Sequence, residues 1–233
     1  MKNTIMVAMV TALLALVGNR GLAHSDMGNH AMAIANYTEA IRLDPRNAEA
    51  FFNRGNAHAN MGNYAMAIAD YTEAIRLDPR DAEAFHNRGV VHGRMGNHAM
   101  AIADYTESIR LDPRNSVAFN ERGWEHYLMG NYARAIADHT EAIRLNPRYS
   151  AAFNDRGSVH ALMGNHAMAI ADFTEAIRLD PRNARAFLGR GLAHYLMRNL
   201  NQAVADFEAA LRINPNLAQA QYFLARARQR RGW

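Results

Sequence analysis

Histidine recurs along this chain at a constant spacing of 34 residues, one per segment of a repeating pattern. Such a column could bind a metal ion or sense protons, because histidine is a common metal ligand that titrates near neutral pH. Zinc, however, needs three or four ligands that converge on one point. One histidine per repeat supplies one ligand per layer, so we expect packing between helices and no metal, with metal binding or proton sensing as the alternative. The column comprises His24, His58, His92, His126, His160 and His194.

Two columns of opposite charge share this spacing. A partly buried guanidinium favours a bidentate carboxylate, so we expect the arginines of one column to pair with the aspartates of the other. Binding of a ligand phosphate by the arginines is the alternative. The columns are Arg20, Arg54, Arg88, Arg122, Arg156 and Arg190, and Asp70, Asp104, Asp138, Asp172 and Asp206.

Two further arginine columns are predicted to be exposed. One has a glutamate three residues before its first five members, a spacing that produces ion pairs on a solvated helix face. The other follows the prolines, but no aromatic stacking residues alternate with it, so nucleic-acid binding is not expected. The columns are Arg42, Arg76, Arg110, Arg144, Arg178 and Arg212; Glu39, Glu73, Glu107, Glu141 and Glu175; and Arg46, Arg80, Arg114, Arg148 and Arg182.

No catalytic constellation is present in the sequence. The chain has no cysteine, no glycine-rich phosphate loop and no metalloprotease helix motif. Its acidic residues recur once per repeat, which is typical of a scaffold. The formal net charge is +4, and four arginines of the C-terminal tail account for it, so the repeats are nearly neutral and do not favour a polyanion. We therefore predict a protein that is not an enzyme and uses no cofactor.

The elements that position these columns follow from a repeat. The stretch 61–80 recurs almost letter for letter at 95–114 and 163–182, and looser copies start at Met27 and Met129. A fixed period of this length indicates an array of structural repeats. The period is set by the only prolines of the chain, which are Pro45, Pro79, Pro113, Pro147, Pro181 and Pro215.

One repeat, 48–81, reads as two antiparallel helices. Residues 48–61 are good helix formers, and Gly62 ends this helix because glycine adopts the left-handed conformation without steric cost. Residues 64–77 carry apolar side chains at i, i+3 and i+4 spacing, which predicts a second helix with one buried stripe. Pro79 then ends it, since the residue before proline is disfavoured in the α region.

This pattern resembles the tetratricopeptide repeat, with arginine and histidine in place of that family's usual leucine and tyrosine. The resemblance implies an all-α fold, a right-handed superhelical solenoid of six helix-turn-helix repeats plus a C-terminal capping helix, 218–233. The matching residues are Phe51, Arg54, Gly55, His58, Ala67, Tyr71 and Pro79. The array spans 14–217, as 14–47, 48–81, 82–115, 116–149, 150–183 and 184–217.

The N-terminal segment allows two interpretations. Lys2 is followed by an apolar run that is too short to span a membrane comfortably but suits a signal peptide, and Gly21-Leu22-Ala23 is a plausible cleavage site. Alternatively, 19–24 repeats the pattern of 53–58 and is the end of the first helix of repeat one. We favour export or membrane anchoring by residues 1–23 over a buried helix in a cytoplasmic protein.

The columns that vary between near-identical copies are those that a ligand would contact. Four such positions lie on one face of the first helix of each repeat. The resemblance places this face on the concave side of the superhelix, which tetratricopeptide proteins use to hold peptides or partner segments. Together with two asparagines beside them, the predicted groove residues are Phe52, Asn53, Asn56, His86, Asn87, Val90, Arg94, Asn120, Trp124, Tyr127, Leu128, Asn154, Ser158, Leu162, Leu188, Leu192, Tyr195 and Leu196.

The C-terminal half of this groove is aromatic and leucine-rich, and such side chains exposed together are typical of a binding site. The alternative is that they pack against the cap or the next helix. The predicted function is a non-enzymatic scaffold that binds a peptide or partner segment in the groove, with a self-assembling rod of stacked repeats as the alternative. Only Asn56 and Asn87 fit the lysine–asparagine clamp with which some family members hold heat-shock chaperones. Because Lys2 is the only lysine, that partner is not expected.

Overall fold

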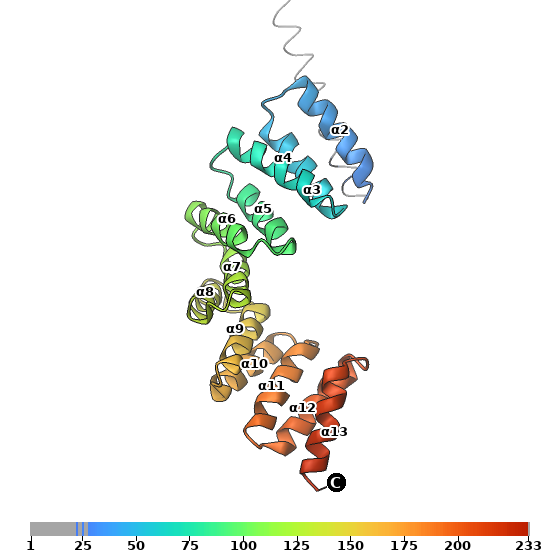
Figure 1. The fold of residues 1–233 in the computed structure, drawn as a ribbon, viewed down its shortest axis with the longest axis vertical. Coiled ribbons are helices and arrows are strands. Elements are labelled where there is room, and N and C mark those ends of the chain that lie inside the picture. Colours follow the sequence, from blue (N-terminus) through green and yellow to red (C-terminus); the bar gives the residue numbers. More distant parts are fainter. Residues whose placement is uncertain (1–21, 23–24, 26–27, 233) are drawn as a thin grey trace, which may run out of the picture. The chain divides into compact units, whose positions relative to one another are not determined.

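A computed structural model describes residues 22, 25 and 28–232. Within these residues the chain forms twelve α-helices and no strand (Figure 1), which confirms the predicted all-α fold. The helices are α2 (His30–Leu43), α3 (Ala48–Asn60), α4 (Tyr64–Leu77), α5 (Ala82–Arg94), α6 (His98–Leu111), α7 (Ser116–Leu128), α8 (Tyr132–Leu145), α9 (Ser150–Leu162), α10 (His166–Leu179), α11 (Ala184–Leu196), α12 (Leu200–Ile213) and α13 (Ala218–Arg230).

The predicted export segment, 1–23, lies outside the described residues except for Leu22, and so does nearly all of the first helix of repeat one. In the part of the chain that the structure describes, no helix is both long and apolar enough to cross a membrane. The right-handed path of the superhelix stays a prediction from the resemblance.

The helix ends lie where the sequence chemistry places them. The side chain of Asn47 accepts a hydrogen bond from the backbone N–H of Ala50 at 2.9 Å and caps α3. Gly62 follows this helix with φ of +77°, a conformation that costs other residues strain. Arg198 takes the same turn position in the last repeat at φ of +62°. The repeat thus folds even where its turn residue has diverged.

The two helices of a repeat approach closely because of one glycine. A Cβ added to Gly55 of α3 would lie 2.8 Å from Cε1 of Tyr71 on α4, a distance that real Cβ contacts do not show. The Tyr71 ring is buried in a cluster with Ala67 of α4 and Val91 of α5, and Ala59 of α3 packs against that cluster. The small residue on the first helix therefore makes room for the large ring on the second.

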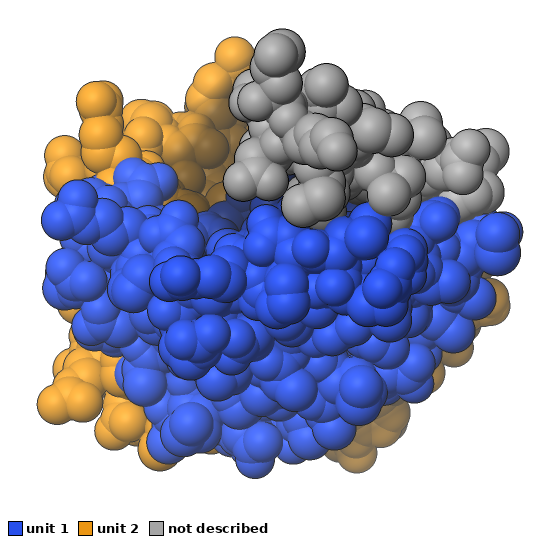
Figure 2. All heavy atoms as spheres, turned by 90° about the horizontal axis from the view of Figure 1, so that it is seen from above, with its two compact units in different colours: residues 1–113 blue, residues 114–233 orange. Residues whose placement is uncertain are grey.

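The chain divides into two compact units, 1–113 and 114–233 (Figure 2), and each is considered by itself. Unit 1 contains α2 to α6 and unit 2 contains α7 to α13. Inside each unit consecutive helices pack together, and the first helices of neighbouring repeats also touch: α3 and α5 in unit 1, α7 and α9, and then α9 and α11, in unit 2. These first helices form what we call the first-helix face of each unit.

An arginine–aspartate pair links the two helices of each repeat from the second to the sixth. Arg156 on α9 donates from Nε and Nη2 to the two carboxylate oxygens of Asp172 on α10, at 2.9 and 2.7 Å. Its Nη1 donates to Oγ1 of Thr140 on α8, in the preceding repeat, at 3.0 Å. The predicted pairing of the two columns is confirmed, and with its donors occupied in this way the guanidinium is a structural clamp. The same pair recurs as Arg54–Asp70, Arg88–Asp104, Arg122–Asp138 and Arg190–Asp206.

The histidine column lies beside these clamps. His160 is buried, and its Nε2 lies 4.0 Å from Oδ2 of Asp172. Burial lowers the pKa of His160 more than the nearby carboxylate raises it, so the ring is neutral near pH 7. Among the described residues no group of three or more histidine, cysteine, aspartate or glutamate side chains could hold a metal ion. His58, His92 and His126 are buried in the same way, which supports packing between helices for these members of the column.

The third arginine column pairs on the outer face, as predicted. Arg178 donates from Nε to Glu175 at 2.8 Å, and both side chains are exposed to solvent. Such pairs contribute little to stability because water and salt screen them. The pattern repeats for Glu39–Arg42, Glu73–Arg76, Glu107–Arg110 and Glu141–Arg144.

Candidate functional site

Each unit has a pocket on its first-helix face. The unit-1 pocket has a volume of about 350 Å³ and lies between side chains of α3 and α5, with Tyr71 of α4 behind them. The unit-2 pocket has a volume of about 330 Å³ and is lined chiefly by α7, α9 and α11. Both are formed by residues at the columns that vary between repeats. They are described in turn.

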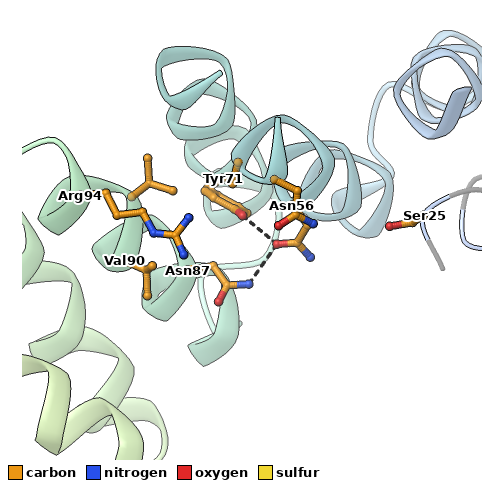
Figure 3. Close-up of a pocket in the computed structure, with 9 residues that line it drawn as sticks. Ser25, Asn56, Tyr71, Asn87, Val90 and Arg94 are labelled. Atoms are coloured by element: carbon orange, nitrogen blue, oxygen red, sulfur yellow. Dashed lines mark hydrogen bonds between the residues drawn. The ribbon is translucent and has the colours of Figure 1, made fainter. Parts of the chain in front are cut away.

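The unit-1 pocket is built around two asparagines (Figure 3). Oδ1 of Asn56 accepts hydrogen bonds from the hydroxyl of Tyr71 at 2.7 Å and from Nδ2 of Asn87 at 3.0 Å. These bonds orient both amides, so that Nδ2 of Asn56 can donate to a ligand and Oδ1 of Asn87 can accept. Burial raises the pKa of Tyr71 far above its usual range, so its hydroxyl stays a donor. Arg94 lies in the same pocket, with its side chain exposed, and supplies a positive charge.

Three predicted groove residues of unit 1 do not line this pocket. Phe52 packs against Tyr71 with ring centroids 6.0 Å apart, and His86 packs against Tyr105 at 5.4 Å. Both are half-buried, because each covers the ring of its own repeat rather than facing the pocket. Asn53 is also half-buried and lies outside the pocket lining. Val90 does line the pocket.

The unit-2 pocket has an aromatic wall. Trp124 and Tyr127 of α7 lie against one another with ring centroids 4.9 Å apart, and Trp124 is 37% exposed. Leu192 and Leu188 of α11 contribute apolar surface, and Ser158 of α9 adds a hydroxyl group. This is the composition of a pocket that takes an apolar side chain.

Just beyond the pocket, the last position of each first helix exposes a leucine in unit 2 where unit 1 has Asn60 and Arg94. These leucines are Leu128, Leu162 and Leu196, which are 46%, 57% and 60% exposed. The exposure expected for these three leucines and for Trp124 is therefore observed.

The exposure expected for two other groove residues is not observed, and this corrects the sequence-based picture. Tyr195 is 6% exposed and Leu188 is 8% exposed. The ring of Tyr195 lies 5.6 Å from that of Phe223 on α13, and the guanidinium of Arg230 lies 4.8 Å from its centroid. The capping helix covers these side chains, as the sequence alternative stated. Tyr195 is therefore a core residue.

Asn120 was predicted to line the groove, but its side chain is 4% exposed and already hydrogen-bonded through both its oxygen and its nitrogen. Its Oδ1 accepts from Nδ1 of the buried His139 at 2.9 Å, and its Nδ2 donates to Oδ2 of Asp155 at 3.1 Å. Burial lowers the pKa of His139 to about 4, so the ring is neutral at physiological pH. Asn120 therefore bonds Asp155, which lines the pocket, and is not itself part of the lining.

Sequence reasoning missed the acidic side of the unit-2 pocket. Asp155 is half-buried and lines the pocket, with Arg185 of α11 on the same lining. Burial raises the pKa of Asp155, and burial also raises the pKa of Glu121, which is further raised by Asp155 and Glu125 nearby. The available signal was a column in which Asn53 and Asn87 of unit 1 are replaced by two acids.

Comparison with known families matches most of the chain. Models described as "Tetratricopeptide repeat" match residues 48–81, 82–115 and 184–217, and residues 120–184, and a model described as "TPR repeat" matches residues 21–62. The chain is a tetratricopeptide repeat protein. A search of curated protein sequences finds no match.

Solved tetratricopeptide structures share this fold. MamA is 27% identical, with 71% of this chain and 96% of that chain covered and a TM-score of 0.66. YrrB, described as a TPR protein with an unusual peptide-binding site, is 23% identical over 80% of this chain and 96% of that chain, with a TM-score of 0.67. PilF of Pseudomonas aeruginosa is 19% identical over 93% and 99%, with a TM-score of 0.80. Family and fold together support a protein-interaction scaffold.

Proposed function

We propose that this tetratricopeptide protein is a non-enzymatic scaffold that holds a partner segment against its first-helix faces, with the apolar anchor of that segment in the unit-2 pocket. The observation that carries the proposal is Trp124, a large aromatic side chain that is exposed at the wall of a preformed pocket. Aromatic anchors in such pockets usually carry most of the binding free energy. Leu128 and Leu162 extend the exposed apolar surface beside it.

The unit-1 pocket would contribute polar contacts. Asn56 and Asn87 are held by their mutual hydrogen bond, so they present one donor and one acceptor in fixed positions. An extended peptide offers the matching carbonyl and N–H groups along its backbone. Preorganised amides lose little entropy on binding, and this favours a peptide ligand for the unit-1 pocket as well.

The alternative function is a rod of repeats stacked end to end, and the surface of α13, the last helix of unit 2, does not favour it. The exposed surface of α13 carries Arg226, Arg228 and Arg230, of which Arg228 pairs with Glu208 and Arg230 lies over Tyr195, whereas Ala220 and Ala227 are buried. Such a charged outer surface does not favour burial against another copy. Interaction with a partner segment is therefore the function that we propose.

The test uses peptides selected from a phage-displayed random library against the intact chain. Trp124→Ala should weaken the affinity of a selected peptide at least tenfold, because truncating an aromatic anchor typically costs about 2 kcal/mol or more. Fluorescence anisotropy measures the affinity, and circular dichroism should show unchanged helix content because Trp124 is exposed.

Tyr222→Ala is the matched control, since Tyr222 is an exposed aromatic residue of unit 2 outside the pocket lining. It should leave the affinity unchanged. Peptides that bind the Trp124→Ala variant as tightly as the wild-type chain would show that the ligand lies on another surface.

A further inference from the structure

Departures from the repeat pattern concentrate around the unit-2 pocket. Glu121 and Asp155 stand at the position where Asn53 and Asn87 stand in unit 1. Tyr149 stands at the helix N-cap, where Asn115 caps α7, and it makes no side-chain capping hydrogen bond. Natural proteins break such local rules chiefly at functional sites. The concentration therefore indicates that this pocket has a specific ligand.

The pocket wall has more hydrogen-bond acceptors than it has donors to satisfy them. Asp155 is half-buried, and its two carboxylate oxygens accept only neutral donors, Nδ2 of Asn120 at 3.1 Å and Nδ2 of Asn154 at 3.2 Å. Oδ1 of Asn154, which lines the same pocket, is buried and has no hydrogen-bond partner in the described part of the chain. A buried acceptor without a donor costs free energy. A ligand that brings donors would remove this cost.

The charge of the pocket wall also favours a ligand that brings hydrogen-bond donors. Burial and then the charge of Asp155 raise the pKa of Glu121, and both acids act on the half-buried Tyr149, whose pKa rises to about 12 chiefly through burial. Arg185 is the one cation among the described residues that line the pocket. Its charge acts on Asp155 and lowers the pKa of that carboxyl, although burial raises it more, and Asp155 has no hydrogen bond from a charged donor. The lining therefore holds the Asp155 carboxylate without an ionic hydrogen bond beside an apolar surface, and a second acid, Glu121, lies near it.

We propose that the unit-2 pocket selects partner segments in which a lysine or arginine stands beside an apolar anchor. The apolar side chain packs against Trp124 and Leu192, and the cation donates to the Asp155 carboxylate. Lysine and arginine carry only donors, which is what this wall lacks. This specificity rests on the proposed function, because it assumes that the segment binds in the unit-2 pocket.

Other cationic or charged ligands fit less well. A metal ion would need several converging ligands, and no cluster of three candidate side chains exists in the described chain. Nucleic-acid phosphates would be repelled by Asp155 and Glu121. The unit-1 pocket offers Arg94 and neutral amides, and no carboxylate is found among the described residues that line it. The preference for a basic side chain should therefore be confined to unit 2.

The experiment compares versions of one library-selected peptide that differ only at its basic position: arginine, citrulline, which is neutral and of nearly the same shape, and glutamate. Trp233→Phe leaves Trp124 as the only tryptophan, so its fluorescence reports binding. The arginine peptide should bind about tenfold more tightly than the citrulline peptide at low salt. The difference should shrink as salt screens the charges.

Asp155→Asn should abolish the preference for arginine over citrulline. The fold tolerates asparagine there, because Asn53 and Asn87 occupy this position in unit 1. The matched control is Asp180→Asn, an exposed acid of unit 2 whose position is asparagine in Asn146 and Asn214. This control should keep the preference, and circular dichroism checks the fold of both variants.

The outcomes separate this inference from the proposed function. Trp124-dependent peptides that lack a basic residue, or that bind equally well with citrulline, would overturn the charge preference and leave the scaffold function intact. A preference for arginine that survives Asp155→Asn would also overturn it. Failure to select any Trp124-dependent peptide would overturn both.

Discussion

The first-helix faces of the two units are built on one scaffold and present different chemistry. Arg88 and Asp104 of unit 1 pair through the same atoms and the same 2.7 Å contact as Arg156 and Asp172 of unit 2. The face of unit 1 offers amides and the cation of Arg94, whereas the face of unit 2 offers aromatic rings, leucines and carboxylates. Columns that are constant between repeats therefore hold the fold, and we propose that columns that vary carry recognition.

The largest expected effect tests the shared scaffold. Asp104→Ala and Asp172→Ala should each destabilise the chain by about 3 kcal/mol or more, because each leaves a partly buried guanidinium without its carboxylate. Urea unfolding measures both. The exposed acids Glu107 and Glu175 are the matched controls, and their replacement by alanine should change stability little, because solvent screens their pairs.

Equal losses in the two units would support one common scaffold. A loss in only one of them would show that the arginine–aspartate pair contributes differently to stability in the two units. The units would then differ in what holds their fold as well as in their first-helix faces.

The fold was predictable because its determinants are local and repeated. The turn position of Gly62 and the stop at Pro79 define helix ends within a residue or two, and columns of arginine and aspartate 16 residues apart predict the clamp. Each of these sequence signals is weak in a single repeat, but the same signal recurs in several repeats and so supports the prediction more strongly. The departures of arginine and histidine from the family pattern were explained by the same clamp, since His58 and Arg54 both lie beside Asp70.

The site was only partly predictable, for two physical reasons. Exposure depends on what covers a face, and the sequence pattern does not show that α13 packs over Tyr195 and Leu188. Whether a polar side chain can bind a ligand depends on the hydrogen bonds that it already makes, and Asn120 is already bonded to His139 and Asp155. Asp155 was not predicted, although Asn53 and Asn87 of the same column were, because a change from amide to acid in the sequence does not show that the acid is half-buried beside a pocket.

A second prediction sharpens the comparison through pH. His139 of unit 2 occupies the position of Tyr71 and Tyr105 in unit 1, and burial lowers its pKa to about 4. The unfolded chain takes up this proton below about pH 6.5, whereas the folded chain resists until about pH 4. His139 therefore stabilises the fold less as the pH falls through this window, by about 3 kcal/mol in total.

His139→Phe should remove this part of the pH dependence. The variant copies repeat five, where Phe173 is matched with Asn154, so the fold accommodates it. Unfolding free energies at pH 7.5 and 4.5, compared between variant and wild type, isolate His139 from the carboxylates and from the other buried histidines. Equal pH slopes in the two proteins would contradict the prediction.

The smallest expected effect concerns the helix cap at Tyr149. Asn115 caps α7 by accepting from the N–H of Ala118 at 3.0 Å, and Asn183 caps α11 through Ala186 at 3.0 Å, whereas Tyr149 gives α9 no such bond. Tyr149→Asn should therefore stabilise the chain by about 1 kcal/mol, the usual value of an N-cap. The reverse swap, Asn183→Tyr, should destabilise it by a similar amount.

The Tyr149→Asn variant also tests whether tyrosine stands in place of the capping asparagine because its ring takes part in recognition. Tyr149 lies close enough to Glu121 and Asp155 for their charges to raise its pKa, so its replacement should weaken the preference for a basic peptide even as stability rises. A gain in stability with unchanged peptide preference would mean that the ring plays no part in recognition. A loss of stability would mean that the packing of the ring outweighs the missing cap, and Tyr149 would then belong to the scaffold, as the constant columns do.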